Sequence, residues 1–277
     1  MNTSIRKIQL VELDIMRQVL KIIEKYNLRY FMLGGTLLGA IRHKGFIPWD
    51  DDMDIGMPRP DYEQFIVLAE KELRAPFQLH TQNNGKGEYS YYYARVENTS
   101  VMLRRSLTAK TVSIPAWIDI FPLDGVPESN KEFKKWYKKN ERNKFLRALS
   151  QFEYSFNIES TKRTKNQGVI ILAKKIIAKS KIYKLIDQDA AWKALDRSLK
   201  AYDYDTSTHL INYCGHWGMK EMFPKSVYGE GRKYPFEDLM LMGPTDYDFV
   251  LGQMYGDYMT PPPDSEKNQH KIELIEN

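Results

Sequence analysis

The stretch GGTLLGAIRHKGFIPWDDDMDIGM, residues 34–57, decides the fold that this sequence predicts. It follows the apolar run 28–33, which is typical of a short buried strand. Its Gly-Gly-Thr start predicts a tight turn into a short helix over 37–42. Acidic and apolar residues then alternate over 50–57, which is the period of a second strand.

The same stretch offers places for a phosphate and a metal ion. Gly35 lets a ligand approach the backbone closely, and a helix opened by Thr36 attracts phosphate through its N–H groups and its dipole. Asp52 and Asp54 stand two positions apart, so on a strand both side chains emerge on one face, where they suit Mg²⁺ or Mn²⁺. The alternative is a solvated acidic turn, but the apolar residue Met53 between them favours a strand packed on one side.

A third carboxylate is expected from the apolar run WIDIFP, residues 117–122. A buried carboxylate without a partner is costly, so Asp119 in such a run either faces solvent or has a task. We interpret it as the residue that completes a two-metal site. The order strand, Gly-Gly-Thr, helix and strand with Asp-x-Asp resembles the signature of the polymerase-β-like nucleotidyltransferase superfamily.

The run from Gly35 to Met57, with WIDIFPLDGVP at 117–127 and YGDYMTP at 255–261, resembles the motifs of the LicD family, to which fukutin and the fukutin-related protein of animals are related. The resemblance implies a nucleotidyltransferase-like fold that moves a phospho-alcohol from a CDP carrier to a sugar hydroxyl. In bacterial members this group is typically phosphocholine, placed on teichoic acid, lipopolysaccharide or capsule, and in the fukutin branch it is ribitol phosphate. The metal-binding carboxylates of the family map onto Asp52, Asp54 and Asp119, with Asp50 as a weaker candidate.

The expected function is therefore a magnesium-dependent phosphotransferase that uses CDP-choline and releases CMP. The acceptor is expected to be a glycan or a lipid-linked oligosaccharide, whose hydroxyl attacks the distal phosphorus in line. Positioning and electrostatics supply most of the rate in such transfers. Asp119 or Asp50 is expected to accept the hydroxyl proton.

Further residues are predicted to bind the donor. Gly35 and Thr36 would cradle a phosphate, and three cations, Arg42, Lys44 and Arg95, would face the diphosphate, with plain surface cations as the alternative. A quaternary ammonium has no hydrogen-bond donor and is held by aromatic rings. The candidates for this cage are Trp49, Tyr91, Tyr93 and Trp117, for which packing on a sheet face is the alternative.

The order of elements predicts an α+β fold with a mixed sheet and a basic helical extension. Helices are expected at 8–26, 37–42, 61–73, 130–156, 168–186 and 190–201, and strands at 28–33, 50–57, 77–81, 89–96, 101–105 and 115–121. Residues 1–128 are expected to form the catalytic core, 129–201 the basic helical segment and 202–277 a region that packs back on the core, all within one compact unit.

Positive charge gathers in one part of the chain. Between Lys131 and Lys184, sixteen Lys and Arg residues stand against four acids, a net of +12 that leaves −7 for the rest of a chain of net charge +5. Basic amphipathic helices bind anionic membranes, so peripheral contact with the inner face of the membrane is predicted, with a solvated basic face as the alternative. No nucleic-acid-binding motif accompanies the charge, so no nucleic-acid partner is expected.

The sequence predicts a cytoplasmic location. There is no uncharged apolar run of about 18 residues and no signal peptide pattern. The single cysteine, Cys214, excludes an internal disulfide. Two alternatives stand beside the predicted function: the transfer of ribitol or glycerol phosphate from its CDP carrier, and a non-catalytic protein that binds glycan or membrane.

Overall fold

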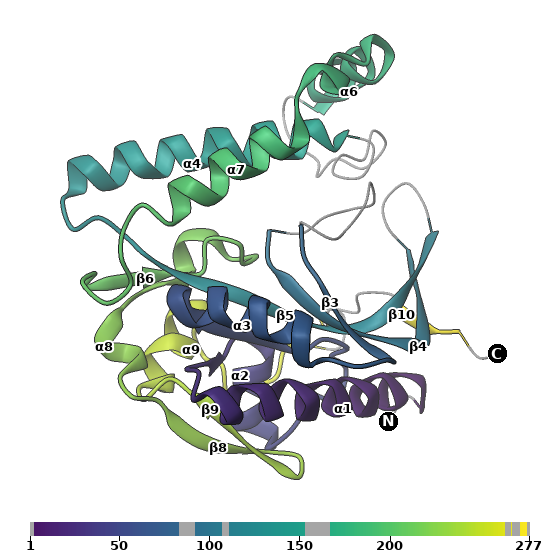
Figure 1. Ribbon diagram of the computed structural model, residues 1–277, viewed down its shortest axis with the longest axis vertical. Coiled ribbons are helices and arrows are strands. Elements are labelled where there is room, and N and C mark those ends of the chain that lie inside the picture. The colour runs from purple at the N-terminus through teal and green to yellow at the C-terminus, as the bar shows by residue number, and fades with distance from the viewer. Residues whose placement is uncertain are drawn as a thin grey trace. The chain divides into compact units, whose positions relative to one another are not determined.

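The computed structural model describes residues 3–82, 92–106, 111–152, 167–263, 267 and 272–275 (Figure 1). The chain forms two compact units. The first contains residues 1–105, 113–126 and 203–277, and the second contains residues 106–112 and 127–202. The predicted core and the C-terminal region thus share one unit, and the predicted basic helical segment belongs to the other.

The first unit is built on a mixed sheet. Its elements in chain order are α1 (Thr3–Tyr26), β1 (Phe31–Met32), α2 (Gly34–His43), β2 (Asp54–Pro58), α3 (Arg59–Glu72), β3 (Phe77–His80), β4 (Ala94–Ser106), β5 (Thr111–Gly125), β6 (His209–Ile211), η2 (Gly218–Glu221), β7 (Met222–Pro224), α8 (Lys225–Tyr228), β8 (Arg232–Phe236), β9 (Leu239–Gly243), α9 (Tyr247–Tyr255) and β10 (Ile272–Leu274). The sheet has the order β1-β2-β5-β4-β10, with β3 on β4, β6 on β5 and β7 on β6. β2 runs parallel to β5, whereas β1 pairs with β2 and β10 with β4 in antiparallel fashion. The predicted α+β fold with a mixed sheet is confirmed.

Helices α1 and α3 pack on each other and on the sheet, α3 against β2 and β3 and α1 against β10 (Figure 1). Helix α1 buries an apolar stripe, because Ile8, Ile15, Met16 and Val19 are all inaccessible to solvent. Burial of such side chains is worth about 1.5–3 kcal/mol each and is the main force that holds the helix to the sheet.

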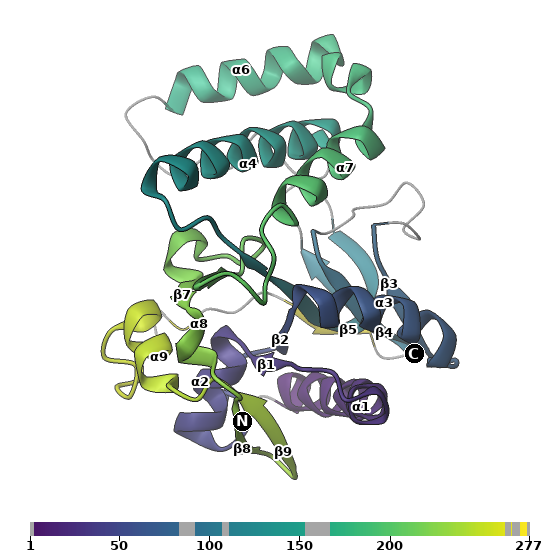
Figure 2. The same cartoon turned by 60° about the vertical axis from the view of Figure 1, so that its left-hand side comes forward.

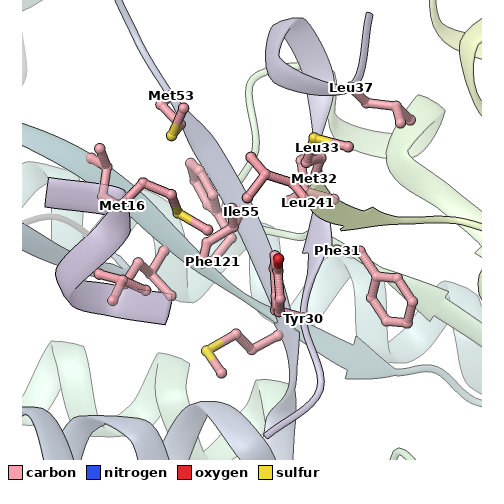
Figure 3. Close-up of a cluster of buried hydrophobic side chains, with 14 of the residues drawn as sticks. Met16, Tyr30, Phe31, Met32, Leu33, Leu37, Met53, Ile55, Phe121 and Leu241 are labelled. Carbon is pink, nitrogen blue, oxygen red and sulfur yellow. The ribbon is translucent and has the colours of Figure 1, made fainter. Parts of the chain in front are cut away.

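The core behind the acidic motif joins α1, β1, β2 and the start of α2. Figure 3 shows Met16 of α1 facing Met53 and Ile55, with Leu33 and Leu37 on the other side of β2. The hairpin of β8 and β9 packs on α2 and β1 (Figure 2). It adds Leu241 to this core, and the Met242 N–H donates to the Tyr30 hydroxyl at 3.0 Å. The strand and helix that carry the motif are therefore fixed from both sides.

The strand predicted over 50–57 is shorter than expected, because β2 begins only at Asp54. The preceding residues are held in a turn, in which the Asp50 N–H donates to the Ile47 carbonyl at 3.0 Å. The Gln9 amide of α1 donates to the Asp50 carbonyl at 2.8 Å. Asp52 thus precedes the strand, and the strand period does not place its side chain.

The Gly-Gly-Thr segment is the first turn of α2 and not a separate tight turn. The helix begins at Gly34, whose φ of +46° favours glycine, and the Leu37 N–H donates to the Leu33 carbonyl at 3.0 Å. The two strands predicted over 89–96 and 101–105 are one, since β4 runs from Ala94 to Ser106. Residues 83–91 lie outside the described part of the chain.

The second unit is helical in its described part. It contains α4 (Asn130–Ser150), α6 (Gln167–Ser180), η1 (Ile182–Leu185) and α7 (Gln188–Leu199). α4 and α7 pack along each other, and the Trp136 indole N–H donates to the Ser198 carbonyl at 2.9 Å. None of the helices that the structure describes has the length and apolar character to cross a bilayer.

Candidate active site

A cleft of about 770 Å³ in the first unit gathers most of the predicted site residues. It is lined by the start of α2, the acidic run before β2, parts of β4 and β5, and two segments of the C-terminal region, 212–221 and 254–262. The predicted residues that line it are Gly35, Arg42, Trp49, Asp50, Asp52, Asp54, Tyr93, Arg95, Trp117 and Asp119. Thr36 and Lys44 do not line it, and Tyr91 lies outside the described residues.

The parallel pairing of β2 with β5 brings the acidic residues of two distant motifs together. In its register Asp54 lies opposite Asp119, and the Asp119 N–H donates to the Met53 carbonyl at 3.0 Å. Burial raises the pKa of Asp54 well above its usual range, and the negative charges of Asp52, Asp119 and Asp50 raise it further. The cleft therefore concentrates negative charge that a bound cation would neutralise.

Asp119 already has a cationic partner. Arg95 of β4 forms a buried, two-pronged ion pair with it, with Nε to Oδ1 at 2.6 Å and Nη2 to Oδ2 at 3.3 Å. The Arg95 side chain is only 4% exposed. The residue predicted for the diphosphate and the residue predicted as the third metal ligand thus bind each other.

The carboxylates fit a magnesium ion as a pair. No group of three or more His, Cys, Asp and Glu side chains in the described parts of the chain is arranged to hold a metal ion. The Asp119 carboxylate is paired with Arg95, so the binding of a metal by Asp52, Asp54 and Asp119 together stays a prediction. Asp52 and Asp54 are left, and Mg²⁺ in phosphate-transfer sites is typically bound by one or two carboxylates, with water and substrate phosphates as its other ligands.

The start of α2 lies against acidic side chains. A Cβ atom on Gly35 would stand 2.6 Å from Oδ2 of Asp50, and one on Gly34 would stand 3.9 Å from Oδ2 of Asp54. The N-cap residue Leu33 supplies no side-chain cap. Carboxylates at a helix N-terminus are stabilised by its dipole, and Asp50 lies against Gly35, the residue predicted to receive a phosphate.

Thr36 has a structural task. Its hydroxyl oxygen accepts a hydrogen bond from the Asp54 N–H at 2.8 Å, and Thr36 itself is buried. This bond ties the first turn of α2 to the first residue of β2. Thr36 thus positions Asp54, and the prediction that it cradles a phosphate stays a prediction.

The two predicted cations of the first motif differ. Arg42 lines the cleft, where its Nη1 donates to the Tyr258 carbonyl at 2.7 Å and its Nε donates to Nε2 of His43 at 2.9 Å. Lys44 ends α2 in a left-handed conformation with φ of 57°, and its carbonyl accepts from the Glu237 N–H at 2.8 Å. Lys44 is an exposed C-cap residue and does not line the cleft.

The described rings of the predicted choline cage contact cations of the chain itself. The Arg95 guanidinium carbon lies 4.4 Å from the ring centroid of Trp117 and 5.8 Å from that of Tyr93. The Lys267 ammonium lies 4.3 Å from the ring centroid of Trp49. The three described rings of the set therefore stabilise Arg95 and Lys267 by cation–π attraction.

The C-terminal region supplies residues that the sequence did not single out. The Glu221 carboxylate accepts from the Asn212 Nδ2 at 2.6 Å and from the Trp217 N–H at 2.8 Å. Both line the cleft with Glu221, as does Tyr255. Within the described structure Asn212 Oδ1 has no partner although the residue is 3% exposed, which leaves a buried acceptor beside the cleft. Only Tyr255 carried a signal, since it belongs to the YGDYMTP motif.

A second buried acid stands behind the site. Glu12 of α1 is 2% exposed, and its Oε2 has no hydrogen-bond partner among the described residues. Burial raises the pKa of Glu12 well above its usual range, and the charges of Asp52 and Asp51 raise it further. The stability contributed by Glu12 is therefore fully present below its pKa in the unfolded chain and is lost as the pH rises through the raised folded pKa.

We expect Glu12→Gln to remove this pH dependence. Each pH unit between the two pKa values costs the wild type about 1.4 kcal/mol, which the neutral amide does not lose. Melting temperatures measured from pH 5 to pH 8 should show a gain for the variant that grows with pH. Glu24→Gln, at an exposed position of the same helix, should follow the wild type. Parallel profiles for Glu12→Gln and wild type would contradict the prediction.

Comparisons with known proteins show the family to which the chain is similar. The family described as LicD/FKTN/FKRP, nucleotidyltransferase domain, matches residues 27–151. The chain is 30% identical over 272 residues to the lipopolysaccharide cholinephosphotransferase LicD of Haemophilus influenzae, with 98% of this chain and 97% of that protein covered. The chain also has a shorter match to the human ribitol 5-phosphate transferase FKRP. This match is 49% identical over 41 residues and covers 15% of this chain and 8% of that protein.

Proposed function

The chain belongs to the LicD family, and from this premise we propose that it transfers phosphocholine from CDP-choline to a sugar hydroxyl of a cell-surface glycan and releases CMP. The observation that carries the proposal is the cleft in which Asp52 and Asp54 meet the start of α2. The likeness to a lipopolysaccharide cholinephosphotransferase over nearly the whole chain supports the choice of choline. Teichoic acid and capsule are further acceptors of the same chemistry.

In the proposed reaction Asp52 and Asp54 would hold Mg²⁺, and its charge would offset that of the donor diphosphate. The acceptor hydroxyl forms a bond to the distal phosphorus while the bond to CMP breaks. Asp50, whose carboxylate lies against Gly35, accepts the hydroxyl proton. Arg42, which is held by the Tyr258 carbonyl at the cleft wall, faces the charge of the departing CMP. The Arg95–Asp119 ion pair fixes β4 against β5 beside the reacting groups.

The test of the proposal is CMP release from CDP-choline in the presence of Mg²⁺ and a lipopolysaccharide oligosaccharide. We expect release to depend on both. CDP-ribitol and CDP-glycerol serve as competing donors, because the chain also has a short match to a ribitol 5-phosphate transferase and Asn212 Oδ1 would accept from a polyol hydroxyl. Turnover of a polyol donor alone would replace choline in the proposal. Failure of every donor would favour a non-catalytic protein that binds glycan.

We propose in addition that the helical unit contacts the inner face of an anionic membrane. Val169, Leu172 and Ile176 recur at three- and four-residue spacing on α6 and are 58–70% exposed. Lys174, Lys175 and Lys179 lie on the same helix, and residues 167–186 contain no acid. An apolar stripe flanked by lysines is the pattern of a helix that lies in the membrane interface.

Vesicle sedimentation checks this contact. We expect binding to vesicles with one-third anionic lipid, little binding to purely zwitterionic vesicles, and release by salt. The pair Leu172→Glu and Ile176→Glu should weaken binding about tenfold or more, since it removes apolar burial and adds repulsion. Val67→Glu, at an exposed apolar position on α3 of the first unit, is the matched control. Equal binding to both vesicle types would contradict the proposal.

A further inference from the structure

The aromatic rings of the cleft divide into two groups by the cations that they already contact. Arg95 lies over Trp117 and Tyr93. Moving it away would cost free energy, because it is buried and paired with Asp119. Trp49 is contacted by two cations, Lys267 at 4.3 Å and Arg42 at 5.9 Å from the ring centroid. A ligand cation at any of these rings must compete with a positive charge of the chain.

Trp217 and Tyr255 form a second aromatic corner of the same cleft. Their ring centroids are 5.5 Å apart at an interplanar angle of 82°, so the edge of one ring meets the face of the other. Trp217 is 42% exposed, whereas Tyr255 is half-buried. In the described part of the chain, the cation that contacts Trp217 is Lys220, whose ammonium lies 5.4 Å from the ring centroid on an exposed side chain. This ring therefore attracts a cation and has no buried ion pair that holds one in place.

A negative charge is built into the same corner. Glu221 is buried and accepts from the Trp217 N–H, which fixes the tryptophan backbone beside the carboxylate. A Cβ atom on Gly215 would stand 2.1 Å from Oε1 of Glu221, so the segment closes around this carboxylate only with glycine at that position. Glu221 and Tyr255 line the same cleft. Two rings beside a fixed carboxylate suit a quaternary ammonium.

The corner is also close to the reacting groups. A Cβ atom on Gly34 would stand 3.7 Å from the Tyr255 hydroxyl and 3.9 Å from Oδ2 of Asp54, so Tyr255 adjoins both the start of α2 and the acidic pair. In phosphocholine only a short ethylene link separates the phosphate ester from the ammonium. Tyr255 adjoins Asp54 on one side and contacts Trp217 on the other. A donor whose phosphate lies at Asp54 thus has its cationic end near the Tyr255 and Trp217 rings.

We propose that Trp217 and Tyr255, with the Glu221 carboxylate beside them, bind the trimethylammonium group of the donor. This subsite replaces the cage predicted from Trp49, Tyr91, Tyr93 and Trp117, and it rests on the proposed transfer of phosphocholine. It selects for a permanent cation without a hydrogen-bond donor. It is therefore the feature that separates a choline donor from a polyol donor.

The test compares the affinities of CDP-choline and CDP-glycerol, which share the nucleotide and the diphosphate, by calorimetry with Mg²⁺. The wild type should prefer CDP-choline. Trp217→Leu should lower that preference about tenfold while the affinity for CDP-glycerol stays the same, and Trp217→Phe should fall between them, because phenylalanine is the weaker cation binder. Trp49→Leu is the matched control, since it removes a cleft tryptophan that contacts Lys267, and it should keep the preference. Thermal melts of each variant verify that the protein is folded.

The outcomes separate the subsite from the proposed function. A wild type that prefers CDP-choline, with that preference retained in Trp217→Leu, would overturn the subsite and leave phosphocholine transfer intact. Loss of the preference in Trp49→Leu instead would show that the ammonium group binds at Trp49, next to the acidic motif. A wild type without any preference for CDP-choline would overturn both the choline donor and its subsite.

Discussion

Replacing Asp54 by Asn is expected to lower the rate of CMP release from CDP-choline about a thousandfold. Asp54 is the first residue of β2, it lies opposite Asp119 in the sheet, and its backbone is tied to Thr36. The substitution keeps the shape of the side chain but removes the charge that, with Asp52, would hold Mg²⁺ on the donor diphosphate. The measurement is the single-turnover rate of CMP release at saturating donor.

The stability of the variant shows whether the loss is chemical. Burial and neighbouring carboxylates raise the pKa of Asp54, so its ionised form is destabilising in the absence of a cation. Asp54→Asn should therefore melt at the same temperature as the metal-free wild type or higher, and added Mg²⁺ should stabilise it less than the wild type. Asp51→Asn is the control, because Asp51 belongs to the same acidic run but does not line the cleft. Full activity of Asp54→Asn would remove this residue from the mechanism.

The local part of the site was predictable from the sequence. Asp54 and Asp119 were expected to lie close together, and they lie opposite each other because apolar residues on both sides of them form β2 and β5, which pair in parallel. The period of two that was used to place Asp52 failed, since Gln9 of α1 and the turn at Asp50 hold residues 50–53 out of the strand. That contact joins residues about 40 positions apart, which no local pattern reveals.

The partners of the predicted residues were not predictable. The sequence predicted Arg95 as a phosphate ligand and the aromatic residues near it as a cage. Arg95 and Asp119 come together only because β4 lies beside β5 in the sheet, and no local pattern reveals that neighbour. The pairing of Arg95 with Asp119 then places a guanidinium over Trp117 and Tyr93 and excludes a second cation there. Glu221 and Trp217 carried no motif and reach the cleft from a segment about 100 residues beyond β5.

The second large effect is expected when this ion pair is broken. Arg95→Ala should lower the free energy of unfolding by about 3–5 kcal/mol, because it leaves the Asp119 carboxylate buried without its partner. Lys at this position would keep the charge but lose the two-pronged geometry and much of the packing on Trp117. Urea unfolding of each variant, with the midpoint and slope fitted separately, gives the cost.

The double variant Arg95→Met with Asp119→Leu decides between two roles of the pair. Replacing a buried ion pair by apolar residues of similar size is often neutral for stability, so the double variant should be more stable than Arg95→Ala by about 3 kcal/mol or more. If it also turns over CDP-choline at a rate within about tenfold of wild type, Asp119 is a positioning residue, and the chemistry rests on Asp52, Asp54 and Asp50. If the double variant is stable but inactive, Asp119 contributes a charge to the reaction, and donor binding must then draw Arg95 away from it.

The two substitutions of the double variant can also be made singly. If each of them lowers the free energy of unfolding only slightly and the two losses add, the ion pair is not what holds β4 against β5. The packing of Trp117 and Tyr93 then accounts for that contact.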